Sequence, residues 1–183
     1  MLQVRRAEVT DFEGIVSLQN INSIKSLSEE QKRDGFLSAN FSAEQFSAMN
    51  DNLAVIVAVQ DNEIEAFLCA STIEFNESFA LPKTMIETFP LAKYESKPLT
   101  DWQVCIAGPV CIDVSVRGQG ILKKLYERLY QVAANSYELA VVFVDLDNTR
   151  SIAAHKKVGM QVLTEFSFNA RRYVIMAGKM TST

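Results

Sequence analysis

The chain has 183 residues, 48% of them hydrophobic, and its 22 acidic side chains outnumber its 18 basic ones. This composition predicts a single domain over residues 1–183 with one sizeable core. The net negative charge argues against a nucleic-acid partner. No apolar run approaches the roughly 18 residues of a membrane-spanning helix, so no membrane partner is expected.

The cysteines and the start of the chain indicate a compartment. Cys69, Cys105 and Cys111 are an odd number, at spacings unlike those of a zinc site or a disulfide framework, and are read as reduced thiols. Met1 is followed by a strand-like run and charges rather than by the apolar region of a secretory signal. We therefore expect a cytoplasmic protein without a metal.

The first part of the chain predicts a strand, three helices and a hairpin. Residues 2–6 read as the strand, and three capping boxes of the Ser/Thr-x-x-Glu/Gln type predict helix starts. They lie at residues 10–13, where the helix is expected to run to about Lys25, and at 28–31 and 42–45. Strands are expected at 53–60 and 65–75, joined by a hairpin turn at Asp61-Asn62.

The second part predicts alternating strands and helices after an interruption. Residues from about 76 to 102 contain three prolines around a short helix. The elements expected after them are a strand from Gln103 to Val116, a glycine turn with its helix, a strand at 139–146, a helix at 148–158, and strands at 160–168 and 172–180 joined by a turn at 169–171.

The turn after the strand at 110–116 is the most informative segment. Arg117-Gly118-Gln119-Gly120 leads directly into an amphipathic helix with Leu122, Leu125 and Leu129 on one face. A helix that starts at glycines presents free backbone N–H groups and the positive end of its dipole, which together favour a phosphate. Arg117 and Lys123-Lys124 add positive charge.

Two familiar phosphate loops do not fit this turn. The chain has no Walker A sequence, and Lys123 stands where a dinucleotide fingerprint needs a third glycine or alanine. The spacing Arg-x-x-Gly-x-Gly/Ala does fit, and with it the chain resembles the GNAT superfamily of N-acetyltransferases. The resemblance implies that this loop holds the pyrophosphate of acetyl-CoA, with Leu122 replacing the last small residue of the motif. The implied contacts come from Arg117, Gly118, Gln119, Gly120, Ile121, Leu122 and Lys123.

A second segment supports the resemblance. In the superfamily an Asn-x-x-Ala/Ser stretch is followed by a tyrosine and then by Gly-Phe, and here these positions hold Asn148, Ser151, His155, Gly159 and Met160. Residues 148, 151 and 155 fall on one helical face. The stretches Asp34-Gly35-Phe36-Leu37 and Gly108 to Cys111 are similar to those of one subgroup of the superfamily.

The resemblance implies the fold. It predicts an α/β (α+β) domain with a mixed, mostly antiparallel central sheet, helices on both faces, and the order β-α-α-α-β-β-(insert)-β-α-β-α-β-β. The insert at about 78–102 is an addition to that core. We expect it to help form the acceptor pocket, with Lys83, Lys93 and Lys97 attracting an anionic acceptor; a packing lobe or a dimer surface is the alternative.

The implied reaction is direct transfer of an acetyl group from acetyl-CoA to an amine. Backbone groups of Ile112 and Val114 would pair with pantetheine, Asn148 and Ser151 would contact the same arm, and His155 would protonate the departing thiolate. Asp113 is a candidate base acting through water. Gly108-Pro109 would suit a bulge in the strand.

Each of these residues also has a structural interpretation. Asn148 can be only a helix N-cap, His155 a buried structural histidine, and Asp113 a solvated strand residue. A covalent acetyl-cysteine route is a further alternative. A non-catalytic acyl-CoA-binding regulatory module on the same fold would fit the departures at Leu122 and His155. The acceptor is expected to be a small-molecule or peptide amine of unknown identity, and a homodimer is left open.

Overall fold

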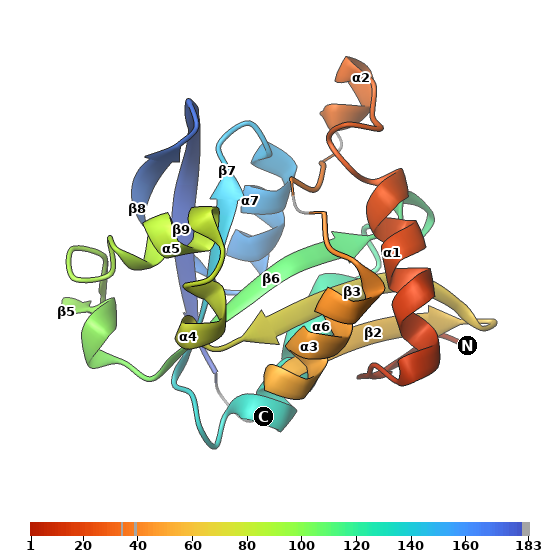
Figure 1. Cartoon of the computed structure of the whole chain (residues 1–183), viewed down its shortest axis with the longest axis horizontal. Coiled ribbons are helices and arrows are strands. Elements are labelled where there is room, and N and C mark those ends of the chain that lie inside the picture. Colours follow the sequence, from red (N-terminus) through yellow and green to blue (C-terminus); the bar gives the residue numbers. More distant parts are fainter. Residues whose placement is uncertain (34, 39, 181–183) are drawn as a thin grey trace.

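The computed structural model describes residues 1–33, 35–38 and 40–180 and is built around one mixed sheet. Its strands lie in the order β1-β2-β3-β6-β7-β9-β8, and every neighbouring pair is antiparallel except β6 and β7 (Figure 1). The strands are β1 (Gln3–Arg6), β2 (Ala54–Gln60), β3 (Glu63–Ser71), β6 (Val104–Ile112), β7 (Leu139–Asp145), β8 (Gln161–Phe168) and β9 (Arg171–Lys179).

Helices cover both faces of this sheet, so the predicted fold class is confirmed. On one face α1 (Phe12–Ile21) and α3 (Ala43–Asn52) pack on β2 and β3, and on the other face lie α6 (Ile121–Ala133) and α7 (Thr149–Lys157). Successive residues of a strand point to opposite faces, and β3 shows this clearly. Phe67 and Cys69 join the core under α1 and α3, whereas Ala66 and Leu68 join the core under α6.

Side-chain caps explain where two of the helices in the first part of the chain begin. Ser28 and Ser42 form the predicted capping boxes with Gln31 and Gln45, at the starts of α2 (Glu29–Lys32) and α3. The box predicted at residues 10–13 is wrong. A 3₁₀ turn, Val9–Asp11, precedes α1, and the Asp11 carboxylate accepts from the N–H of Glu8 at 2.7 Å. The first helix also ends at Ile21 rather than near Lys25.

The hairpins form as predicted, but the strand expected at 65–75 ends at Ser71. Asp61, Asn62, Asn169 and Ala170 all have positive φ, as two-residue hairpin turns require. After Ser71, the hydroxyl of Thr72 accepts from the Phe75 N–H at 3.2 Å and starts α4 (Ile73–Asn76).

The insert contains α5 (Ala80–Ile86), a small hairpin of β4 (Lys93–Tyr94) and β5 (Lys97–Pro98), and a 3₁₀ turn, Leu99–Asp101. Met85, Phe89 and Leu99 are buried in a core shared with β6, β7 and β9, so part of the insert packs on the sheet. Leu91, in the same insert, is exposed.

The strand expected to reach Val116 also ends early. β6 stops at Ile112, and Asp113 caps a 3₁₀ turn, Val114–Val116, so the placement of Asp113 and Val114 on this strand is wrong. The bulge expected at Gly108-Pro109 is confirmed, because Leu68 pairs with Val110 and Ala70 with Ala107. Gly108 has φ +147°, which favours glycine.

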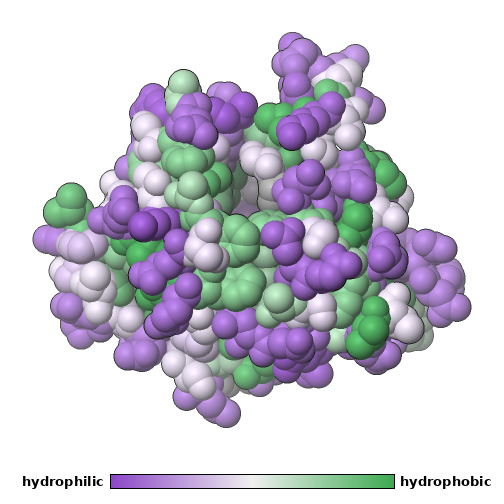
Figure 2. Space-filling model, viewed as in Figure 1, coloured by the Kyte–Doolittle hydropathy of each residue, from purple (hydrophilic) through white to green (hydrophobic). Residues whose placement is uncertain are grey.

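The parallel pairing of β6 with β7 is short. It joins Val104 to Leu139, Cys105 to Ala140 and Ile106 to Val141, although both strands continue beyond these pairs. The sheet is therefore open between the carboxyl ends of the two strands. On the face in Figure 2 a hollow bordered by hydrophobic residues lies between the part that carries α5 and the segment that follows α2.

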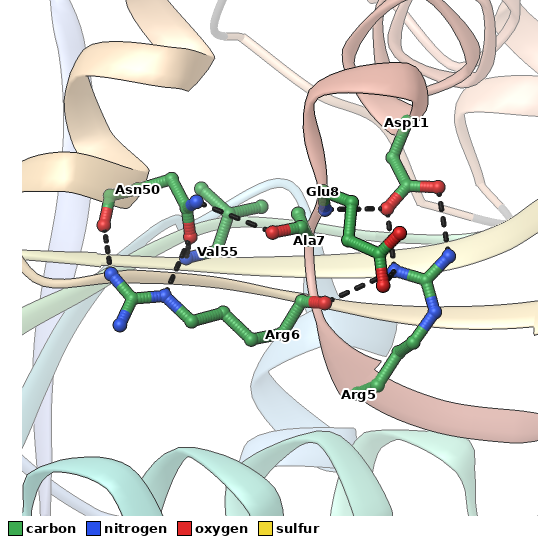
Figure 3. Close-up of polar contacts among 7 residues, drawn as sticks. All are labelled: Arg5, Arg6, Ala7, Glu8, Asp11, Asn50 and Val55. Carbon is green, nitrogen blue, oxygen red and sulfur yellow. Dashed lines mark hydrogen bonds and ion pairs between the residues drawn. The ribbon is translucent and has the colours of Figure 1, made fainter.

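Two arginines of β1 hold the start of the chain against α1 and α3 (Figure 3). Arg5 makes two hydrogen bonds with the Asp11 carboxylate, at 2.6 and 3.0 Å. Arg6 donates to the side chain of Asn50, which in turn donates to the Ala7 carbonyl and accepts from the N–H of Val55.

Replacing Asp11 by Asn should lower the free energy of unfolding at pH 7 by about 1–2 kcal/mol, since an ion-paired hydrogen bond is lost. Burial raises the pKa of Asp11, but the bonds from Arg5 and Glu8 outweigh it and hold the pKa below its ordinary value. A lowered carboxyl pKa stabilises the fold above about pH 4 and ceases to do so as the pH falls through the folded value. Urea unfolding from pH 7 to 3 should therefore show the difference shrinking with acid; a constant difference would contradict the assignment.

Candidate active site

Two cavities meet at the opening between β6 and β7. The larger, of about 500 Å³, lies against the end of β6, the start of α6 and one side of α7. The smaller, of about 280 Å³, extends toward the insert. Their walls share the residues Phe36, Leu37, Val110, Asn148, Ser151 and His155. A molecule in one cavity would therefore lie next to a molecule in the other.

The start of α6 forms one end of the larger cavity. Gly118 and Gly120 both have left-handed φ, +79° and +73°, and Gly120 is the N-cap residue of the 13-residue helix. A Cβ at either glycine would meet nothing within 4 Å, so backbone conformation rather than space selects glycine here. The first N–H groups of a helix have no intrahelical acceptor. Ile121, Leu122 and Lys123 therefore present theirs at the cavity wall, as a pyrophosphate requires.

Three side chains around this turn have different environments: Leu122 is buried, Arg117 is hydrogen-bonded to neighbouring elements, and Lys123 is exposed. Leu122 is buried in the core beneath α6, so its replacement of a small residue leaves the backbone of the first turn in place. The Arg117 guanidinium donates to the Ile112 carbonyl and to Asn22 Oδ1, each at 2.9 Å, and so ties the turn to the ends of β6 and α1. Lys123 is exposed, 3.7 Å from a Glu127 carboxylate oxygen.

The predicted residues before the turn divide into two groups. Ile112 lines the larger cavity together with Val110 and Cys111, on the edge of β6 that has no ladder with β7. Asp113, Val114 and Gln119 do not line either cavity. The Asp113 carboxylate accepts from the N–H and the hydroxyl of Ser115 at 2.9 and 2.7 Å, and Val114 is exposed.

The second predicted motif does gather at the junction of the cavities. Asn148 caps α7 by accepting from the Ser151 N–H at 3.3 Å, and its amide donates to the Phe36 carbonyl at 2.9 Å. The cap prediction is therefore confirmed, and the same side chain also fixes the segment that contains Phe36. Asp34, the first residue of the Asp-Gly-Phe-Leu stretch, lies outside the described residues.

The surroundings of His155 favour one tautomer of the neutral ring. Its Nδ1 lies 2.8 Å from the Ser151 carbonyl oxygen; a carbonyl can only accept, so Nδ1 carries the proton. Nε2 is buried without a hydrogen-bond partner, and the ring lies edge-on to Tyr126 at 5.8 Å. Burial lowers the pKa of His155, and the bond to Ser151 only partly offsets this. The neutral ring thus presents a proton acceptor, and the predicted donor role would first require protonation of Nε2.

The smaller cavity has a mostly apolar wall. Phe79, Leu81 and Pro82 come from the insert, so these insert residues do reach a cavity beside the junction. Asp145, at the end of β7, is buried and accepts from Arg171 Nε at 2.6 Å and from the Asp147 N–H at 2.9 Å. This carboxylate was missed in the sequence because it ends an apolar run; a charge at the carboxyl end of a parallel strand was the available signal.

Neither thiol chemistry nor a metal is indicated by the described residues. Cys111 lines the larger cavity, but burial raises its pKa, and that of Cys105, to about 12, far from what a thiolate nucleophile needs. In the part of the chain that the structure describes, no group of three His, Cys, Asp or Glu side chains is arranged to hold a metal ion. Over the same residues, no helix is long and apolar enough to cross a membrane.

Comparisons with known proteins agree with this geometry. The model of the Acetyltransferase (GNAT) family matches residues 21–160, whereas no curated protein sequence matches the chain significantly. Ard1 from Thermoplasma volcanium is similar in structure with a TM-score of 0.66 at 10% identity, over 97% of both chains. The yncA protein from Salmonella typhimurium, solved with its cofactor acetyl-CoA, has a TM-score of 0.64 at 14% identity, over 99% of this chain and 95% of its own. The ribosomal-protein-alanine N-acetyltransferase from Brucella melitensis has 0.62 at 15%, over 97% and 99%.

The state of His155 can be measured directly, because it is the single histidine of the chain. In protein labelled with ¹⁵N-histidine we expect one ring signal set, with the Nδ1–H tautomer and a pKa below the ordinary value of about 6.5. Replacing Ser151 by Ala should leave this tautomer unchanged, because the acceptor is the backbone carbonyl. An Nε2–H tautomer or a pKa at or above 6.5 would contradict the assignment.

Proposed function

The chain belongs to the GNAT acetyltransferase family, and we propose that it transfers an acetyl group from acetyl-CoA to an amine. The supporting observation is the left-handed glycine turn at the start of α6, which lies at one end of a cavity that runs along the unpaired edge of β6. Acetyl-CoA supplies the acetyl group as a thioester. The amine nitrogen forms a bond to the acetyl carbon while the carbon–sulfur bond breaks and CoA leaves as the thiol.

In this proposal the backbone performs most of the binding. The N–H groups of Ile121, Leu122 and Lys123 hold the pyrophosphate, and the free edge of β6 near Val110 and Ile112 lies along the pantetheine arm. Arg117 positions the turn through Ile112 and Asn22 and adds positive charge beside the phosphates.

The two cavities give the reactants separate places. The donor occupies the larger cavity and the amine the smaller one, so that amine and thioester meet at the shared wall of Val110, Ser151 and His155. Holding both reactants in one geometry removes much of the entropic cost of their encounter. His155 lines both cavities, and its Nε2 is available as an acceptor of a proton or of a hydrogen bond.

Replacing Gly120 by Val should weaken CoA binding at least about tenfold. A β-branched residue is strained at this φ by more than ~1–2 kcal/mol, and the turn must shift, which moves the N–H groups that hold the pyrophosphate. Isothermal titration calorimetry with CoA tests this.

Gly159 provides a matched control. It has φ +94°, its Cβ would also meet nothing within 4 Å, and it does not line either cavity. Gly159→Val should therefore destabilise the protein to a similar degree yet bind CoA with unchanged affinity. If the two variants bind CoA equally well, the pyrophosphate assignment is wrong.

A non-catalytic acyl-CoA-binding module is the second candidate, favoured by one observation. The buried Nε2 of His155 carries no proton in its fixed tautomer, so no acid is ready to meet the leaving thiolate. Release of free thiol from acetyl-CoA in the presence of an amine panel distinguishes the two. Amine-dependent release supports the transferase, and tight CoA binding without release supports the binding module.

A further inference from the structure

We propose that the acceptor is a small primary amine with an aromatic or bulky apolar body and no second charge, such as an arylalkylamine. This inference rests on the proposed function and assigns the chemistry of its second cavity. The cavity of about 280 Å³ lies just below the roughly 300 Å³ at which small-molecule pockets begin. It therefore suits a compact molecule.

Aromatic rings make up much of this wall. Phe41 and Phe79 contact each other edge-to-face at 5.6 Å, and Phe143 and Tyr173 do so at 5.8 Å. The first pair joins the segment after α2 to the insert, and the second pair stands on β7 and β9. Rings held in this way offer faces and edges to another aromatic body, which gains contact energy beyond the area it buries.

The charge of the cavity wall also restricts the charge that an acceptor molecule can carry. Among the described residues that line this cavity, Asp145 is the one with a formal charge; the charge is negative and is paired with Arg171 at 2.6 Å. Lys83, Lys93 and Lys97, which we expected to attract an anionic acceptor, are exposed and do not line the cavity, so they add no positive charge to its wall. An anionic acceptor would face a carboxylate and apolar rings.

A polycationic acceptor fits poorly for a related reason. The Asp145 carboxylate already accepts from Arg171 and from the Asp147 N–H, so its one negative charge is shared with the Arg171 guanidinium and cannot balance several ammonium groups. A second ammonium would lie against phenylalanine, leucine and proline side chains, where a charge without a partner is costly. An amine with a single charge and an apolar body meets neither difficulty.

The contact between Phe41 and Phe79 favours a small molecule over a peptide. It connects the segment after α2 with the insert, and so closes the part of the wall where these two rings stand. A peptide N-terminus would need an open path for the chain that follows its first residue.

The test measures kcat/KM for acetyl transfer with 2-phenylethylamine, tryptamine, spermidine, glutamate and peptides that begin with Ala or Phe, after CoA binding has been verified by calorimetry. We expect phenylethylamine or tryptamine to exceed spermidine, glutamate and both peptides at least tenfold. Preference for spermidine, glutamate or a peptide overturns the proposal but leaves the transferase function intact. CoA binding without acetylation of any amine also overturns it, and failure to bind CoA overturns the proposed function itself.

A variant tests the wall directly. Phe79→Glu adds a second carboxylate, so it should lower kcat/KM for the aromatic amines at least tenfold, raise that for spermidine, and leave CoA affinity unchanged. Leu91→Glu, on the exposed side of the same insert, should change none of these values. If Phe79→Glu does not fold, Leu81→Glu replaces it in the same wall. Unchanged preference in a folded variant of either kind contradicts the proposal.

Discussion

The site depends on how little of β6 pairs with β7. Three residue pairs join these parallel strands, and beyond Ile106 and Val141 the strands continue without a ladder between them. The smaller cavity begins at that point, lined by Ile106 and Val142, and the larger one continues from Val110 toward the start of α6. Backbone groups on the free edge of β6 need partners, and a ligand that runs along the strand can supply them. The bulge at Gly108-Pro109 shifts the register with β3 at the same place, so the strand bends where the cavities meet.

A small number of polar contacts keeps this opening in shape. Asn148 caps α7 and donates to the Phe36 carbonyl, while Arg117 connects the turn before α6 with Ile112 and Asn22. Each of these side chains joins elements that are far apart in the sequence. Phe36 and Asn148 line both cavities, whereas Arg117, Ile112 and Asn22 line the larger one. The contact between Asn148 and Phe36 therefore shapes the wall that the two cavities share.

Local signals in the sequence predicted the parts of the fold that local chemistry controls. The boxes at Ser28 and Ser42, the turn at Asp61-Asn62 and the start of α6 depend on residues within four positions of each other, and all form as expected. Strand ends were missed where Thr72 and Asp113 cap a helical turn in place of a further strand residue. The smaller cavity could not be predicted, because its rings come from segments around residues 36–41, 79, 143 and 173, which only the tertiary fold brings together. For the same reason the sequence did not show that the lysines of the insert lie outside this wall.

The buried contact between α6 and α7 contains two polar atoms that lower the stability of the fold. His155 Nε2 and the Tyr126 hydroxyl are both buried without a hydrogen-bond partner, and their rings are in contact. Each such group costs on the order of 1–3 kcal/mol relative to a satisfied one, a large share of the 5–15 kcal/mol by which a domain is typically stable. Apolar rings of the same shape would remove that cost. The two polar atoms therefore lower the free energy of unfolding, and they do so beside the residues that line the two cavities.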